Sequence, residues 1–114
     1  MSIASDLIRG HIDTIILAHL RNEDSYGYKI NKSIRQKTDD LYEIKEATLY
    51  TAFKRLEENG NISSYWGDEK SGARRRYYSI TKEGIHTYQR LKDEWQMAKT
   101  LIDKLITEEE HYNE

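Results

Sequence analysis

Apolar residues recur every three or four positions in three successive stretches of the chain, the spacing that places them on one face of a helix. The first stretch runs from Asp6 to Leu20, the second follows residue 25, and the third runs from Ala47 to Asn59. The positions that define these faces are Ile8, Ile12, Ile15, Ile16 and Leu20, then Tyr26, Ile30 and Ile34, then Leu49, Phe53 and Leu56. The pattern predicts three amphipathic helices that pack their apolar faces together.

The ends of these helices carry shorter signals. Ser25 or Asp24 is expected to cap the second helix, because either side chain accepts hydrogen bonds from free backbone N–H groups. The LYEI segment at 41–44 is interpreted as a small strand. Residues 45–46 lack a strong capping side chain for the third helix, whereas Gly60 stands where a left-handed helix end needs a residue without a Cβ.

Two segments rich in β-branched and aromatic residues, NISSYW and RRRYYSI, follow the third helix. The stretch Gly67–Ala73 between them is expected to be a hairpin loop. Side chains alternate along a strand, so Arg76, Tyr78 and Ile80 share one face while Arg75 points the other way. Tyr78 and Ile80 are therefore expected to cover the core.

A heptad pattern follows Thr81, which is the expected N-cap of a helix from Lys82 to Glu109. At ~1.5 Å per residue this helix would be roughly 40 Å long, more than a small domain can cover. Its apolar seam, at alternating spacings of three and four, consists of Tyr88, Leu91, Trp95, Ala98, Ile102 and Leu105. The seam predicts a homodimer. The alternative is a helix that packs only on its own domain.

This element order predicts a mainly α fold with a two-stranded β wing, that is, a winged helix-turn-helix plus a long C-terminal dimerisation helix. The expected DNA-binding domain spans residues 1–80, the dimerisation helix 81–110 and a tail 111–114. With 114 residues, 33% of them charged and 37% hydrophobic, the chain suits one small globular domain. It shows no secretion signal, membrane span or cysteine, which predicts a cytoplasmic protein.

Basic charge is concentrated in the middle of the chain, where residues 45–82 carry +3 against −1 for 1–44 and −4 for 83–114. The outward face of the third helix and the wing base therefore form the predicted contact with double-stranded DNA, made by Thr48, Tyr50, Thr51, Lys54, Arg55, Arg74 and Arg75. Hydroxyls suit phosphates or base edges, and the wing arginines suit the phosphate backbone or a narrow minor groove. Two alternatives stay open: Tyr50 belongs to the core, and the arginines only protect a solvated hairpin edge.

Other classes of function are disfavoured. No nucleophile with an oriented base, phosphate-binding loop or carboxylate pair occurs in the sequence, so neither an enzyme nor a cofactor is expected. His11 and His19 lie eight positions apart on one predicted helix, about 12 Å, too far to share a metal ion directly. The remaining alternative to a DNA-binding protein is a winged helix that binds an acidic protein surface.

Three motifs, YGYKI, EATLYTAFKRLEENG and SYWGDEKSGARRRYYSIT, occur in an order and spacing that resemble the PadR family of bacterial transcriptional regulators. Because a single helix follows the wing, the chain is similar to the small subclass with one C-terminal dimerisation helix. It is most similar there to multidrug-sensing repressors of efflux-transporter genes. The resemblance implies a ligand-responsive repressor of a transporter or stress gene that binds a pseudo-palindromic operator as a homodimer.

The resemblance also implies an effector site for planar aromatic molecules. In those repressors a tryptophan from each C-terminal helix stacks on the drug in a hydrophobic pore at the dimer centre, and Trp95 matches it. Leu91 and Ala98 are its expected neighbours on the seam. Lys99 stands where the multidrug repressor has an acidic residue, four positions after its tryptophan. This change of charge argues against a preference for cationic ligands. Asp13 is the acidic group expected to offset the charge of Lys99.

Overall fold

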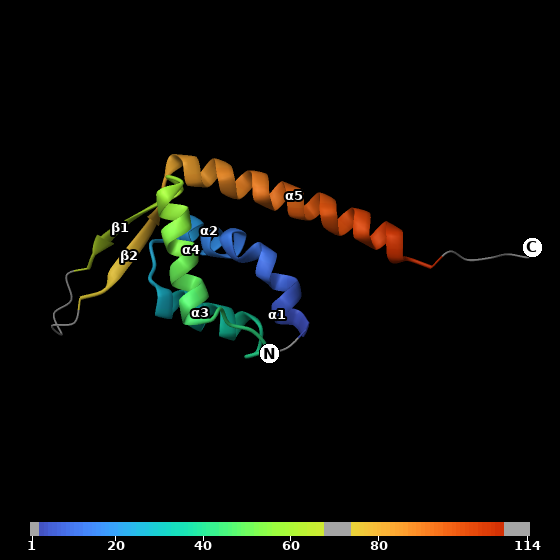
Figure 1. Cartoon of the computed structure of the whole chain (residues 1–114), viewed down its shortest axis with the longest axis horizontal. Coiled ribbons are helices and arrows are strands. Elements are labelled where there is room, and N and C mark those ends of the chain that lie inside the picture. The colour runs from blue at the N-terminus through green and yellow to red at the C-terminus, as the bar shows by residue number, and fades with distance from the viewer. Residues whose placement is uncertain (1–2, 68–73, 109–114) are drawn as a thin grey trace, which may run out of the picture.

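The computed structural model describes residues 3–67 and 74–108 (Figure 1). The chain forms five α-helices, one 3₁₀ turn and a two-stranded antiparallel sheet within these ranges. Figure 1 shows the hairpin at one end of the molecule and the last helix running away from the other elements. This is the mainly α fold with a β wing that the sequence predicts. No helix in the described part of the chain is both long and apolar enough to cross a bilayer.

The first predicted helix is broken into α1 (Ile3–Ile8), a 3₁₀ turn η1 (Arg9–His11) and α2 (Ile12–Asn22). The prediction of one continuous helix over 6–20 is therefore wrong. The break contains Gly10, whose helix propensity is lower than that of any residue except proline. His11 has φ −115° and ψ 12°, outside α-helical values. Helices α1 and α2 consequently point in different directions (Figure 1).

The core lies between α2, α3 (Gly27–Lys37) and α4 (Glu46–Glu58). The apolar face predicted for the third helix is confirmed as buried, and so are Ile30 and Ile34 of the second and three of the five positions predicted for the first. Tyr26 is only half-buried, because it precedes the helix as its N-cap. The fully buried side chains of greatest volume are Phe53, Ile16, Leu17, Leu20, Ile30, Ile44, Leu49 and Leu56. The hairpin closes this core, because the Tyr78 ring stacks on Phe53 with centroids 4.0 Å apart and an interplanar angle of 15°.

Neither predicted cap is used at the start of α3. The N-cap residue is Tyr26, without a side-chain hydrogen bond. Ser25 instead pairs its backbone with Tyr78, the N–H of each residue donating to the other's carbonyl at 3.1 and 2.8 Å. The Asp24 carboxylate accepts a bond from the Tyr65 hydroxyl at 2.6 Å. The wing therefore binds the Asp24 carboxylate and the Ser25 backbone, and the N-cap of the helix falls one residue after Ser25.

The small strand interpreted at 41–44 is also absent, and this segment is irregular. Its backbone needs no partner strand because a side chain supplies the bonds. The Asn31 amide accepts from the Ile44 N–H at 2.9 Å and donates to the Ile44 carbonyl at 2.7 Å. One amide thus ties the connection between α3 and α4 to α3, and Ile44 becomes a core residue.

The sheet pairs β1 (Ile62–Trp66) with β2 (Arg76–Ile80) so that Ile62 lies opposite Ile80 and Trp66 opposite Arg76. Gly60, which follows α4, has φ 78°, as predicted for a left-handed helix end. Tyr78 is buried and Ile80 packs against the core, which confirms the predicted inward face of the second strand. Most of the predicted hairpin loop, 68–73, lies outside the described residues.

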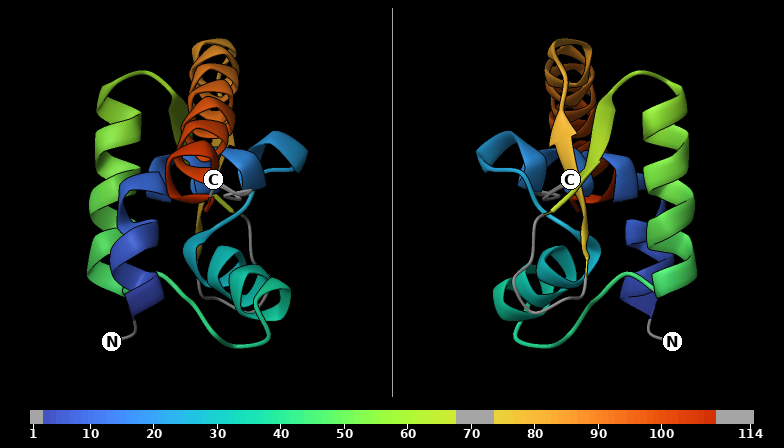
Figure 2. Two further views of the ribbon diagram at one scale, coloured as in Figure 1. Left: turned by 90° about the vertical axis from the view of Figure 1, so that its right-hand side faces the viewer. Right: turned by 90° about the vertical axis from the view of Figure 1, so that its left-hand side faces the viewer.

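Helix α5 (Lys82–Ile106) begins at the predicted cap, where the Thr81 hydroxyl accepts the Gly84 N–H at 3.0 Å. It ends before the predicted 109, since Thr107 has an extended backbone. Tyr88 and Leu91 pack against the core of their own domain. Beyond Trp95 most side chains are exposed, and Figure 2, which looks along α5, shows α4 standing to one side of it.

Candidate nucleic-acid interface

Helix α4 presents a polar face opposite its buried one. Thr48, Thr51 and Lys54 are exposed, while Leu49 and Phe53 on the other side are in the core. These three side chains lie at spacings of three residues and so share one face of about two turns. The face carries hydroxyls and one cation, a combination suited to phosphates and base edges.

Tyr50 is half exposed at the surface and half packed against its neighbours. Its side chain is 50% exposed, yet its ring meets Phe53 edge-on with centroids 5.7 Å apart. Its hydroxyl would lie only 3.1 Å from a Cβ at Gly27, so the glycine allows α3 and α4 to approach closely. Tyr50 therefore packs over the junction of these two helices and keeps one edge exposed.

Arg55 and Asp13, predicted for DNA and effector binding respectively, bind each other. The Arg55 Nη2 lies 2.5 Å from Asp13 Oδ1, and its Nε donates to Oδ2 at 3.2 Å. This two-point bond raises the pKa of Arg55 and joins the C-terminal half of α4 to the start of α2. Because the carboxylate already neutralises the guanidinium, Lys54 is the stronger candidate of the two for a phosphate contact.

The wing arginines lie on aromatic rings. The guanidinium carbons of Arg74 and Arg76 lie 5.1 and 5.6 Å from the Trp66 centroid, and that of Arg75 lies 4.8 Å from the Tyr26 centroid. All three arginines are exposed. Trp66 is 52% exposed. It is the last residue of β1, and Arg74 and Arg76 both lie against its indole.

Helix α3 carries a basic and aromatic face that the sequence reasoning missed. Tyr28, Lys32 and Arg35 follow one another at spacings of four and three and project from the same side of the helix. Arg35 lies 6.0 Å from the Tyr28 centroid and pairs with Glu43 at 2.8 Å. In helix-turn-helix proteins the first helix crosses the DNA backbone, so this face suits phosphates. The periodicity of these three residues was the available signal.

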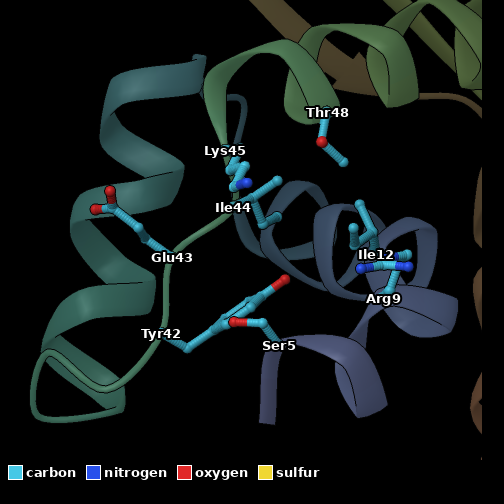
Figure 3. Close-up of a pocket in the computed structure, with 8 residues that line it drawn as sticks. All are labelled: Ser5, Arg9, Ile12, Tyr42, Glu43, Ile44, Lys45 and Thr48. Atoms are coloured by element: carbon cyan, nitrogen blue, oxygen red, sulfur yellow. The ribbon is translucent and has the colours of Figure 1, made fainter. Parts of the chain in front are cut away.

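A polar pocket of about 260 Å³ lies beside the first turn of α4 (Figure 3). Its lining residues are Ser5, Arg9, Ile12, Tyr42, Glu43, Ile44, Lys45 and Thr48. In Figure 3 the Glu43 carboxylate points away from the pocket toward α3. Burial raises the pKa of Tyr42, against an opposing influence of Arg9. As the sequence predicts, no side chain caps the start of α4 here.

The histidines have separate contacts. His19 lies between the Ile15 carbonyl and the Ser33 hydroxyl, at 2.9 and 3.1 Å, and burial lowers its pKa. His11 meets the Trp95 ring edge-on, with centroids 4.8 Å apart. Over residues 3–67 and 74–108, no group of three or more acidic or histidine side chains is placed to hold a metal ion.

The predicted effector residues are only partly brought together. Trp95 is 39% exposed and Ala98 is half-buried, with Lys99 exposed one turn beyond the tryptophan. Leu91 instead packs on the core, and Asp13 is held by Arg55. His11 is the unpredicted neighbour of Trp95, and the break in the first helix is what places it there.

The predicted seam divides at Trp95. Its first two members, Tyr88 and Leu91, pack within their own domain, as the alternative interpretation expects for the whole helix. Ile102 and Leu105 are 49% and 82% exposed. The apolar surface left for another molecule therefore begins at Trp95 and extends toward the end of α5.

Three known proteins resemble the chain over most of its length. A family model described as "Transcriptional regulator PadR-like family" matches residues 16–90. An uncharacterised protein of Lysinibacillus sphaericus is 45% identical over 101 residues, which cover 89% of this chain and 93% of that protein. The structure of a transcriptional regulator from Clostridium thermocellum is 56% identical with a TM-score of 0.83, covering 90% of this chain and all of that one. A PadR family transcription regulator from Clostridium difficile R20291 is 37% identical with a TM-score of 0.75, over 85% and 99% of the two chains.

Proposed function

From the premise that the chain belongs to the PadR-like family of transcriptional regulators, whose members bind DNA, we propose that it is a sequence-specific, ligand-responsive repressor. In this proposal it acts as a cytoplasmic homodimer on a pseudo-palindromic operator of a transporter or stress gene. Helix α4 enters the major groove, and the wing and α3 hold the flanking phosphates.

One observation carries the DNA-binding proposal. The exposed Thr48, Thr51 and Lys54 face of α4 lies in the same winged helix as a hairpin whose second strand is preceded by two exposed arginines, Arg74 and Arg75. Base edges are read by short polar side chains on a helix in the major groove, whereas arginines outside it contribute phosphate contacts. The two kinds of contact come from different elements here, so they are separable by experiment.

Binding to the promoter fragment upstream of the protein's own gene tests the proposal. Fluorescence anisotropy would compare this fragment with unrelated DNA of equal length over 50–200 mM salt. We expect affinity to fall with salt for both, with the promoter bound roughly 10³-fold more tightly or better, as specific regulators do. Equal, weak binding to both would favour the alternative of a protein-association module.

Substitutions should separate affinity from sequence preference. Arg75→Ala should weaken specific and unrelated DNA together and reduce the salt slope by about one phosphate contact. Thr51→Ala or Lys54→Ala should instead reduce the difference in affinity between specific and unrelated DNA, because each removes a contact inside the major groove. The same anisotropy titrations measure both effects. Unchanged binding in all three variants would place the interface on another surface.

The effector site is proposed at Trp95, for planar aromatic molecules bound between two subunits. The support is an exposed indole at the point where the seam leaves the domain core. A molecule held there would touch both copies of α5 and could change the angle between the two winged helices. It would release DNA only to the extent that it prefers an arrangement whose recognition helices no longer match adjacent major grooves, about 34–36 Å apart.

Planar aromatic compounds are expected to quench Trp95 fluorescence and to lower operator affinity. The measurement uses Trp66→Phe, which leaves Trp95 as the one tryptophan of the chain and should keep both effects. This background is needed because Trp66 is exposed. Trp95→Ala should lose the quenching and the ligand-induced release of DNA. If Trp95→Ala bound these compounds as tightly as the parent does, Trp95 would be a packing residue and not part of an effector site.

A further inference from the structure

The base of the wing is joined to the corner that links α2 to α3. The Ser25 and Tyr78 backbones exchange two hydrogen bonds, and the Tyr65 hydroxyl donates to Asp24. The bond to Asp24 raises the pKa of Tyr65. The hairpin therefore has a defined position relative to the residue that follows the corner, Tyr26, which is the N-cap of α3.

Three tyrosine rings form a cluster at this junction. Tyr65 and Tyr77 are nearly parallel, with centroids 5.6 Å apart and an angle of 12°. Tyr26 meets Tyr77 edge-on at 5.2 Å. The extended backbone of Tyr26, with φ −141° and ψ 167°, directs its ring to the wing although the next residue begins a helix. Tyr26 is thus held by Tyr77 from the second strand.

This arrangement holds Arg75 both at its backbone carbonyl and at its guanidinium group. Its carbonyl accepts the Gly67 N–H at 2.7 Å, which extends the hairpin one bond beyond the strands. Its guanidinium carbon lies 4.8 Å from the Tyr26 centroid. An arginine placed on an aromatic face loses less conformational freedom when it binds an anion.

The other charged groups of this corner have partners of their own. Glu23 of the same corner is bonded to Lys29 at 2.7 Å and Asp24 is bonded to Tyr65. Lys29 belongs to the first turn of α3, which has no side-chain cap. Because the Arg75 guanidinium lies over Tyr26, the N-cap residue of α3, it is close to the positive end of this helix, which attracts phosphate.

We propose that Tyr26 is a positioning residue for DNA binding: it holds Arg75 beside the first turn of α3, so that Arg75 contacts a backbone phosphate there and not the minor groove. The inference rests on the proposed DNA-binding function. It assigns to Tyr26 a role that acts through Arg75, without a base contact of its own. The wing and the helix-turn-helix then bind the backbone as one unit.

A double-mutant cycle on salt-dependent binding tests this role. The variants are Tyr26→Leu, Arg75→Ala, their combination and Tyr26→Phe, titrated by anisotropy against a labelled random-sequence duplex between 50 and 200 mM salt. Tyr26→Leu and Arg75→Ala should each lower affinity about threefold to tenfold and reduce the salt slope by about one. The combination should bind no more weakly than Arg75→Ala alone. Tyr26→Phe keeps the ring and should bind as the parent does.

Several results would overturn the inference. Additive losses, or a weaker Tyr26→Leu variant with an unchanged salt slope, would make Tyr26 a structural residue only. A Tyr26→Phe variant as weak as Tyr26→Leu would make the hydroxyl the DNA contact. A loss by Arg75→Ala confined to duplexes with A-tracts would place Arg75 in the minor groove. If the parent protein binds no DNA, the proposed function itself fails.

A further variant leaves Tyr26 unchanged and so applies even if Tyr26→Leu does not fold. Arg75→Lys keeps the charge but replaces the planar guanidinium that lies on the ring. We expect it to lose part of the affinity that Arg75→Ala loses. Binding equal to the parent would show that charge alone is sufficient and that the ring does not position it.

Discussion

Gly84→Ala is expected to destabilise the protein more than an alanine at Gly10, Gly27 or Gly60 would. A Cβ at this position would lie 2.0 Å from the Asn61 carbonyl oxygen, 2.9 Å from the Asn61 carbonyl carbon and 2.7 Å from Ile80 Cγ1. Two of these atoms belong to the backbone, which has to move to make room. Added atoms in packed interiors typically cost 1–3 kcal/mol, and with a backbone clash we expect about 3 kcal/mol or more.

The same close approach connects the wing to α5. The Thr81 N–H donates to the Asn61 carbonyl, and the Thr87 hydroxyl donates to the Asn61 side chain at 2.8 Å. Gly84 lets the first turn of α5 lie directly on this residue. A shift here would therefore change the direction in which α5 leaves the domain, besides lowering its stability.

Gly10→Ala is the matched control, since a Cβ at Gly10 meets nothing within 4 Å. In this helical turn alanine should leave stability unchanged or raise it by up to about 1 kcal/mol. Urea unfolding followed by circular dichroism would compare the two variants with the parent. A Gly84→Ala variant as stable as Gly10→Ala would mean that α5 does not lie against Asn61 as described.

Ile102→Glu combined with Leu105→Glu is expected to produce a monomer. Both side chains are exposed and follow Trp95 on the seam, so the substitutions should leave the fold of the domain unchanged. In a dimer they would bury four carboxylates without partners, two from each subunit, at a cost that exceeds what such a seam contributes. Leu91 is left unchanged because it packs on its own core.

Loss of the dimer should greatly weaken binding to the operator. Two joined binding domains bind one site about 10²- to 10⁴-fold more tightly than one domain does, provided both reach their half-sites. Light scattering and operator titration would measure the two effects on the same samples. Met97→Glu is the matched control, since it adds a charge to an exposed apolar position on the side of α5 away from the seam. A dimer that survives the double substitution would show that another surface joins the subunits.

Local sequence determined the elements and the sides of the elements that are buried. The apolar face of the third predicted helix lies in the core, as do Ile30 and Ile34 of the second and Tyr78 of the second strand. Thr81 and Gly60 act as predicted at a helix start and a helix end. Each of these features depends on neighbours within a few residues, through the helical period, the alternation of a strand or the backbone freedom of one residue.

Tertiary structure decided which of the exposed and polar groups meet. Asp13 pairs with Arg55 across 42 positions, Trp95 meets His11, and Tyr26 meets Arg75. These contacts pair Asp13 with Arg55, which were expected to serve separate sites, and they underlie the role that we propose for Tyr26.

Competition between local and long-range bonds explains the errors at element boundaries. Ser25 is a good capping residue by type, but its backbone pairs with Tyr78 and the N-cap position falls on the next residue, Tyr26. The 41–44 segment has strand-forming residues, but the Asn31 side chain satisfies the backbone of Ile44. A periodic pattern shows which side of a segment is apolar, but it does not show which residue the segment will bond to. That partner depends on which hydrogen-bond donors and acceptors the folded arrangement of α2, α3 and the wing brings close to the segment.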